Sequence, residues 1–336
     1  MKKTLIIDIE KHFPSAAKIF DGADYFSPQL GPNQMKCLQP IPGVAETEAR
    51  YKGVKVKAKW EELEDKYDHV VFVWPVHSFN DPGYTPNIDE RRQFFKEIYD
   101  KIKGMGIEKY IYIDDSDRAI VKRGLDWLDA EGMQCDAVFK REYRANWKHD
   151  YDDRVHPFPF AMFGKPNAAW TLYEERQNPS GEKLNQCFWA GVPRFNMDPI
   201  TPDEHVDRGM ILNSIGHSIS VFYNLSPETF MDTFSRYKFF LNLNGNGHLC
   251  KRFFEGMSRG SLMMMQETDL VFPFESGDYF SSQTVFKDGY EFLWKFEDLK
   301  NHDKLYKSCL INQNYLINKY YNYEWIRDYI YRSLNK

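Results

Sequence analysis

The stretch that decides the fold is residues 238–266, KFFLNLNGNGHLCKRFFEGMSRGSLMMMQ. An apolar run leads into a loop rich in glycine and asparagine, and a run that mixes apolar with charged residues leads into a second apolar run. Short apolar runs indicate buried β-strands, and the mixed run indicates an amphipathic helix. The stretch therefore predicts a strand, a loop, a helix and a strand, which is the repeating unit of a parallel α/β sheet.

The same rhythm extends to both sides of this stretch. In the first half, TLIIDI, HVVFVWPV, KYIYIDD and QCDAVFKREY are predicted strands. The run DERRQFFKEIYDKIKGMG between two of them is a predicted helix that ends on glycine, and a further helix is expected over residues 116–131. In the second half the predicted strands are NQCFWAGV, SISVFYNL, KFFLNLN, SLMMMQ and TVFKD, and most of the chain from Tyr290 onward is predicted to be helical.

A chain of 336 residues is long for one domain. A polar stretch with several prolines, between about residues 146 and 185, separates the two series of strands. We expect one Rossmann-like domain over residues 1–165, a second over 166–315, and a C-terminal helix over 316–336 that crosses back to pack near the domain interface. Open α/β sheets bind ligands outside the carboxyl ends of their strands, so we expect both domains to present their loops to a shared cleft.

The composition limits the class of protein. A net charge of −5 argues against a protein whose whole surface binds nucleic acid. No run approaches the roughly 20 apolar residues that span a bilayer, and acidic residues interrupt the short apolar run at the N-terminus. Five widely spaced cysteines lack the pairing of a zinc site or a disulfide framework. These features predict a cytoplasmic protein without a membrane span.

The loop of the opening stretch has the composition of an anion site. Gly245 and Gly247 allow a sharp turn because glycine adopts positive φ without strain. The first N–H groups of the following helix lack backbone partners and carry the positive end of the helix dipole, which suits phosphate oxygens. Further donors near this end come from His248, Lys251 and Arg252. A diphosphate can be held by such a loop without a metal ion.

Glu255 lies one turn further along the predicted helix. A carboxylate beside a nucleotide commonly accepts hydrogen bonds from the two hydroxyl groups of ribose. The alternative interpretation is structural, because Lys251, Glu255 and Arg259 follow one another at intervals of four residues and would form ion pairs on an exposed helix face. Spacing by itself leaves both interpretations open.

The segments RYKFFLNLNGNG, KRFFEGMSRGS and LMMMQ resemble the donor-binding domain of GT-B glycosyltransferases, and are similar to the capsule-associated and protein O-glucosyltransferase family and, more loosely, to exostosin-like and spore-coat enzymes. The resemblance covers about 40 residues. It implies a GT-B fold and a hexosyl- or pentosyltransferase that uses a nucleotide sugar, UDP-linked by this resemblance, with no further cofactor. The donor-binding residues that it implies are Arg194, which follows the strand FWAGV, and Asn244, Gly245, Asn246, Gly247, His248, Lys251, Arg252 and Glu255.

Glycosyl transfer also needs a base near the acceptor hydroxyl. In a GT-B arrangement this base comes from loops of the first domain. One candidate loop follows HVVFVWPV and contains His77 and Asp81, and the other follows KYIYI and contains Asp115. The alternative is that these residues only cap helices or complete loops.

Asp115, Ser116 and Asp117 also form the DxD pattern with which GT-A glycosyltransferases hold a divalent cation. The pattern is short, and Ser116 with Asp117 would equally start the next helix. A single-domain GT-A fold would leave the second half of the chain unexplained. We therefore keep the metal-dependent enzyme as an alternative and predict no metal site.

The sequence says least about the identity of the acceptor. Residues 140–156, KREYRANWKHDYDDRVH, mix basic with aromatic residues, and residues 51–60 alternate lysines with apolar residues. Such patterns can follow a phosphate backbone, so a hydroxymethylated DNA base is an alternative acceptor. The acidic balance of the chain favours a glycan, and lysines along a strand edge explain residues 51–60 equally well. A further alternative is a non-catalytic module that only binds a nucleotide sugar.

Overall fold

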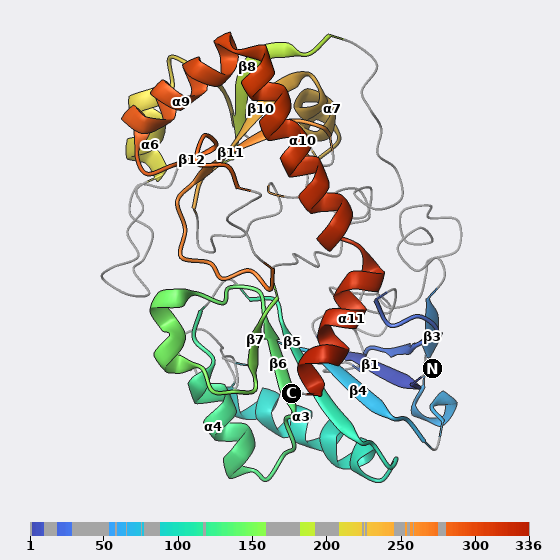
Figure 1. Ribbon diagram of the computed structural model, residues 1–336. Helices are drawn as coiled ribbons and strands as arrows, with labels where there is room; N and C mark the ends of the chain where they lie inside the picture. Colours follow the sequence, from blue (N-terminus) through green and yellow to red (C-terminus); the bar gives the residue numbers. More distant parts are fainter. Residues whose placement is uncertain are drawn as a thin grey trace. The chain divides into compact units, whose positions relative to one another are not determined.

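The structure is a computed structural model in which two compact units are distinguished (Figure 1). Unit 1 consists of Met1–Pro166, Val271–Pro273 and Tyr323–Lys336, and unit 2 consists of Asn167–Leu270 and Phe274–Asn322. The residues that the structure describes are 2–9, 19–28, 54–57, 59–64, 66–74, 76, 88–116, 119–158, 182–191, 208–223, 225, 227–244, 253, 256–257, 259–274 and 280–335.

Unit 1 is built on a seven-stranded sheet in the order β3-β2-β1-β4-β5-β6-β7, in which every neighbouring pair is parallel. Its strands are β1 (Thr4–Asp8), β2 (Asp24–Phe26), β3 (Lys55–Lys57), β4 (His69–Val73), β5 (Lys109–Asp114), β6 (Ala137–Lys140) and β7 (Val155–Pro157). The inner strands β1 and β4 are buried at every position, which explains their continuous apolar runs. The lysines of β3 lie at the edge of the sheet, where charges discourage further strand pairing.

Helices cover both faces of this sheet. α3 (Ile88–Lys103) buries Phe95, Ile98, Tyr99 and Ile102, whose spacing forms one helical face. Together with α4 (Lys122–Ala130) this face packs on the side of the sheet that carries Val70 and Phe72. The short 3-10 helices are η2 (Trp60–Glu62) and η4 (Ala145–Asp150).

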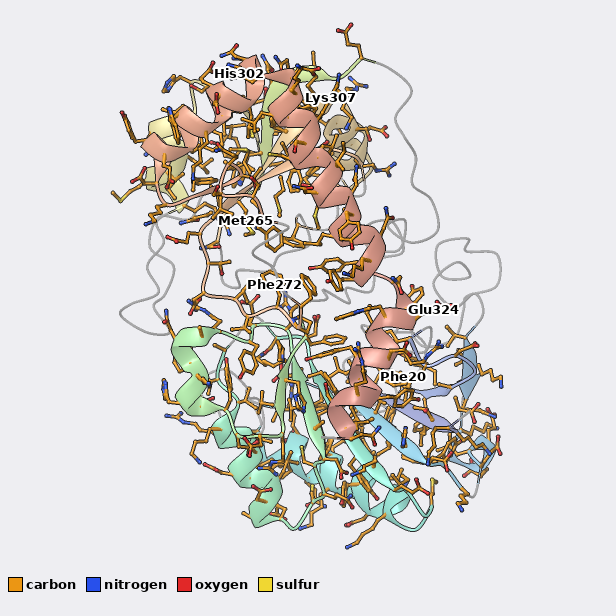
Figure 2. All side chains as sticks on the ribbon, viewed as in Figure 1. Phe20, Met265, Phe272, His302, Lys307 and Glu324 are labelled. Carbon is orange, nitrogen blue, oxygen red and sulfur yellow. The ribbon has the colours of Figure 1, made fainter. Side chains whose placement is uncertain are left out.

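The last helix of the chain, α11 (Tyr323–Leu334), belongs to unit 1 and covers the other face of its sheet. The hydroxyl of Tyr329 donates to the carbonyl oxygen of Pro157 at 2.8 Å, and its ring lies 5.8 Å from that of Phe139. The ring of Tyr331 lies 6.1 Å from that of Phe20, which Figure 2 labels beside α11. The chain therefore returns to unit 1 through α11, whereas residues 316–322 of the predicted C-terminal helix belong to unit 2.

Unit 2 holds a five-stranded parallel sheet in the order β12-β11-β10-β8-β9. Its elements are β8 (Leu184–Ala190), α6 (Arg208–Ile215), β9 (Ser220–Phe222), α7 (Pro227–Ser235), β10 (Tyr237–Asn242), β11 (Leu262–Gln266), β12 (Val285–Phe286), α9 (Gly289–Asn301) and α10 (Asp303–Tyr320). One face of the sheet packs on α6, α9 and α10, and Phe188 and Phe240 on the other face meet Phe234 of α7. The predicted α/β fold class is therefore confirmed.

One predicted helix starts later than expected. The sequence places a helix start near Ser116, whereas α4 begins at Lys122. The Ser116 hydroxyl instead accepts a hydrogen bond from the Lys140 amine at 2.6 Å, so it does not cap a helix. The first amides of α4 are bound by the Asp150 carboxylate, which accepts from the Val121 and Lys122 N–H groups. A contact between distant residues therefore replaced the local cap.

Candidate active site

The order of the strands in unit 2 marks where a ligand would bind. From β8 the chain forms β9 on one side and then returns to form β10 on the other side of β8. The carboxyl ends of β8 and β10 therefore flank the topological switch point, where open α/β sheets leave a crevice. Arg194 follows β8 in the sequence, and Asn244 follows β10. The sheet order thus brings together the two strands that precede the predicted donor-binding segments.

Asn244 is the one predicted donor residue that the structure describes, and it is only 2% exposed. Its backbone N–H donates to Oε1 of Gln266 at 3.0 Å, and its side-chain amide donates to the carbonyl oxygen of Glu267 at 2.9 Å. Its Oδ1 atom is buried and has no hydrogen-bond partner in the described part of the chain. Buried polar atoms are nearly always paired, so this acceptor is suited to a donor group of a ligand.

Arg208 is a residue that the sequence reasoning missed. It is the first residue of α6, and its Nε donates to the carbonyl oxygen of Asn244 at 3.1 Å. A guanidinium therefore lies at the carboxyl end of β10, where a diphosphate would need positive charge. The available signal was its place at the start of the helix that follows β8. Asn244, Gln266 and Arg208 together form what we call the polar floor of unit 2.

The remaining predicted donor residues lie outside the described residues, and their roles stay predictions: Arg194, Gly245, Asn246, Gly247, His248, Lys251, Arg252 and Glu255. Three described residues of the same stretch, Phe253, Gly256 and Met257, pack closely in unit 2. Phe253 and Met257 are buried, and a Cβ atom on Gly256 would lie 2.6 Å from ring atoms of Phe234 and Phe240. Gly260, two residues before β11, has φ of +64°, a conformation that favours glycine.

In unit 1 the switch point lies between β1 and β4, because the chain forms β2 and β3 on one side of β1 and β4 to β7 on the other. The loop with His77 and Asp81 follows β4, and both residues lie outside the described part. Asp115 follows β5, the neighbour of β4. The candidate base loops therefore follow two adjacent strands beside the switch point.

Several charged side chains are buried at this carboxyl edge. Asp8, Asp114, Lys140, Arg141 and Glu142 are each at most 2% exposed. Burying an ion is costly even when it is paired, which makes these groups candidates for a functional role. The sequence analysis assigned no role to Asp114 and considered Lys140 and Arg141 only as part of the basic and aromatic stretch at residues 140–156.

Asp115 forms an ion pair with Arg141. The distance from Arg141 Nε to Asp115 Oδ1 is 3.1 Å, and the two side chains are 1% and 7% exposed, respectively. The same Nε donates to the backbone carbonyl oxygen of Asp115 at 3.0 Å. A guanidinium at this distance stabilises the carboxylate, the form that can accept a proton, and fixes its orientation. The role of Asp115 as a general base stays a prediction.

The same contacts oppose the DxD interpretation. Asp115 binds a guanidinium and Ser116 binds an ammonium, so two positive charges occupy the surroundings of the first half of the pattern. Asp117 lies outside the described residues, and within the described ones no cluster of three or more His, Cys, Asp or Glu side chains is arranged to hold a metal ion. The two α/β units also exclude the single-domain architecture of this alternative.

The basic and aromatic stretch at residues 140–156 is less available than its sequence indicates. Lys140 and Arg141 are buried in ion pairs. Arg154 binds Asp129 and Asp152, each at 2.7 Å. Three basic side chains of residues 140–156 therefore already have carboxylate partners. This weakens the expectation that the stretch follows a phosphate backbone.

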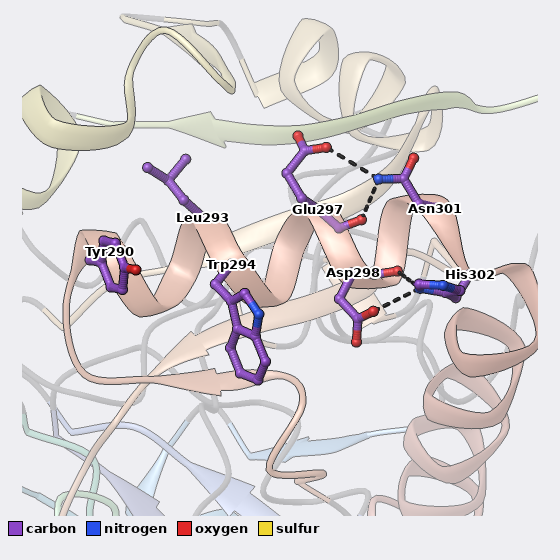
Figure 3. A pocket seen from close by; sticks show the side chains of 7 residues that line it. All are labelled: Tyr290, Leu293, Trp294, Glu297, Asp298, Asn301 and His302. Carbon is purple, nitrogen blue, oxygen red and sulfur yellow. Dashed lines mark hydrogen bonds and ion pairs between the residues drawn. The ribbon is translucent and has the colours of Figure 1, made fainter.

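A surface pocket of about 450 Å³ lies on the outer side of α9 (Figure 3). It is lined by Tyr290, Leu293, Trp294, Glu297, Asp298, Asn301 and His302. Its polar groups bind one another along the helix, because Asn301 donates to the Glu297 carbonyl at 2.8 Å and His302 lies 2.7 Å from the Asp298 carboxylate. The pocket is a face of one helix and includes none of the predicted site residues.

No family model matches the chain, and no curated protein matches it. Solved structures do match. T4 phage BGT in complex with its UDP-glucose substrate has a TM-score of 0.52 at 12% identity, over 99% of this chain and 100% of that chain. The chain has the GT-B fold. T4 phage BGT with UDP and Mn²⁺ gives a TM-score of 0.50 at 13% identity, with the same coverage. An α1,3-fucosyltransferase with GDP-fucose gives 0.42 at 10% identity, over 100% of this chain and 91% of that chain.

The GT-B fold agrees with the fold that the resemblance of the opening stretch implies. The narrower likeness to capsule-associated, protein O-glucosyltransferase and exostosin-like enzymes stays a prediction. Within the described ranges, no helix combines the length and the apolar character needed to cross a bilayer.

Proposed function

We propose that this chain is a glycosyltransferase that transfers a sugar from a UDP-linked donor to a hydroxyl group of an acceptor. The observation that carries the proposal is the polar floor of unit 2, in which Asn244 keeps a buried acceptor atom without a described partner at the switch point of a GT-B fold. Its structural neighbour BGT binds UDP-glucose, which supports a uridine nucleotide.

In the proposed reaction the acceptor oxygen attacks the anomeric carbon while the bond from this carbon to the diphosphate breaks. Asp115 takes the proton from the attacking hydroxyl, with His77 and Asp81 as the other candidates. The electron pair of the broken bond leaves with the nucleoside diphosphate. Its charge is stabilised by the loop that follows β10, with Arg252 and Arg208, and Glu255 binds the ribose. We expect no metal requirement.

A glycan is the acceptor that we favour. The pairing of Lys140, Arg141 and Arg154 with carboxylates removes part of the basic surface that a DNA acceptor would use. A hydroxymethylated DNA base remains the alternative acceptor. We infer a cytoplasmic location from the spread of the cysteines, of which Cys135, Cys187 and Cys309 are free and buried.

The proposal is tested by calorimetric titration with UDP, GDP and their sugars, followed by turnover assays with glycan and hydroxymethylated DNA acceptors, with Mn²⁺ or with EDTA. Glu255→Ala should weaken donor binding while the thermal unfolding temperature stays unchanged. Glu297→Ala is the matched control, because it removes an exposed glutamate of α9. Failure of every nucleotide sugar to bind would refute the proposal. Binding without turnover on any acceptor would favour the non-catalytic module.

A further inference from the structure

Asp114, the last residue of β5, gathers three hydrogen-bond donors on a carboxylate that is fully buried. Its Oδ2 accepts from the backbone N–H of Val76 at 2.9 Å. Its Oδ1 accepts from the backbone N–H of Ser116 and from the Lys140 amine, both at 3.0 Å. One side chain therefore binds the backbone that follows β4, at Val76, and the backbone that follows β5, at Ser116.

Lys140 completes this arrangement from β6. Its amine donates to the Ser116 hydroxyl at 2.6 Å and lies 3.3 Å from the Ser116 carbonyl oxygen. Val76 immediately precedes His77, and Ser116 immediately follows Asp115. The ion pair consequently holds one residue next to His77 and one next to Asp115, although it includes neither of these two candidate bases.

Backbone hydrogen bonds also join the strands that surround this ion pair. β4, β5 and β6 are joined by continuous parallel ladders, and the N–H of Trp74 donates to the Ile113 carbonyl at 3.1 Å. A buried ion pair is frequently no more stabilising than apolar side chains of similar volume, because both ions lose their hydration. Its specific contribution is therefore to the backbone beyond the strands, at Val76 and Ser116.

We propose that Asp114 and Lys140 are positioning residues for glycosyl transfer, which fix the backbone at Val76, next to the candidate base His77, and at Ser116, next to the candidate base Asp115. The role in catalysis rests on the proposed function. The role in ordering the backbone is independent of it, since it follows from the hydrogen bonds to Val76 and Ser116.

Two double variants separate positioning from simple stabilisation. Asp114→Leu with Lys140→Met removes the charges and every acceptor oxygen. Asp114→Asn with Lys140→Met removes the same charges but keeps an amide oxygen that can accept the Val76 N–H. We expect turnover to fall by about 10- to 100-fold in the leucine variant and to recover largely in the asparagine variant, with the KM for the donor unchanged in both.

Hydrogen exchange supplies a measurement that needs no activity. In the leucine variant the amides of Val76 and Ser116 should exchange at least about tenfold faster, while those of α3 keep their protection. Leu128→Ala, a cavity variant in the core of the same unit, serves as the control for general destabilisation and should leave the two amides and the turnover unchanged at low temperature.

Equal exchange rates and equal turnover in the two double variants would overturn the proposal, because they would leave the pair a purely structural role. If the parent protein transfers no sugar at all, the proposed function fails. The exchange rates alone then decide whether Asp114 and Lys140 order the backbone at Val76 and Ser116.

Discussion

Lys183 should make the stability of unit 2 depend on pH in the alkaline range. Its amine donates to the carbonyl oxygen of Arg259 at 2.6 Å and to the Ser261 hydroxyl at 3.0 Å. Arg259 and Ser261 lie directly before β11, so these hydrogen bonds join the residue that precedes β8 to the start of β11. Burial, together with repulsion from the nearby Arg259, lowers the pKa of Lys183 from 10.5 to about 8.

The sign follows from proton binding. Between pH 8 and 10.5 the unfolded chain holds a proton on this lysine that the folded chain has largely lost. The free energy of unfolding therefore rises with pH across this window. Below pH 8 the buried amine is protonated, and its full destabilising effect on the folded state is present. The lowered pKa corresponds to a loss of about 3 kcal/mol in the free energy of unfolding. The partial exposure of the side chain reduces this loss to about 2 kcal/mol.

Urea unfolding of the parent and of Lys183→Met at pH 7, 8, 9 and 10 measures this effect. The free energy of unfolding of the parent relative to the variant should rise by about 2 kcal/mol towards pH 10, because all other titrating groups cancel in the comparison. Lys304→Met, at a surface lysine of α10, is the control and should show a difference that is independent of pH. A constant difference for Lys183→Met would refute the assignment of a charged, poorly solvated amine.

Three further predictions concern the candidate site. Asp115→Asn should lower turnover by at least about 100-fold with donor affinity unchanged in calorimetry, whereas an equal loss in Asp117→Asn that Mn²⁺ modulates would favour the metal interpretation. Arg208→Met should raise the Kd of the nucleoside diphosphate about tenfold, and an unchanged Kd would place it outside the site. Gly256→Ala should lower the free energy of unfolding by about 1–3 kcal/mol in urea, because its methyl group would overlap two phenylalanine rings; a neutral result would contradict the close packing.

The parts predicted correctly from the sequence share a physical basis. The strands β4, β10 and β11 are short, continuous apolar runs, and α3 has apolar residues at helical spacing before a glycine. These signals are local, because an apolar run or a helical spacing of apolar residues is complete within a few consecutive residues. The predicted start of α4 near Ser116 was wrong, because the Ser116 hydroxyl is bound by Lys140, 24 residues further along the chain.

The sequence by itself determined two series of parallel strands and helices, and it indicated which loops follow them. Only the tertiary structure decided which of these loops lie at a switch point, since that depends on the order of the strands in the sheet. It also decided the pairing of Asp115 with Arg141, of Asp114 with Val76 and of Arg208 with Asn244, at separations of 26 to 38 residues. Such contacts form when strands distant in the sequence become neighbours, so no local pattern of residues records them.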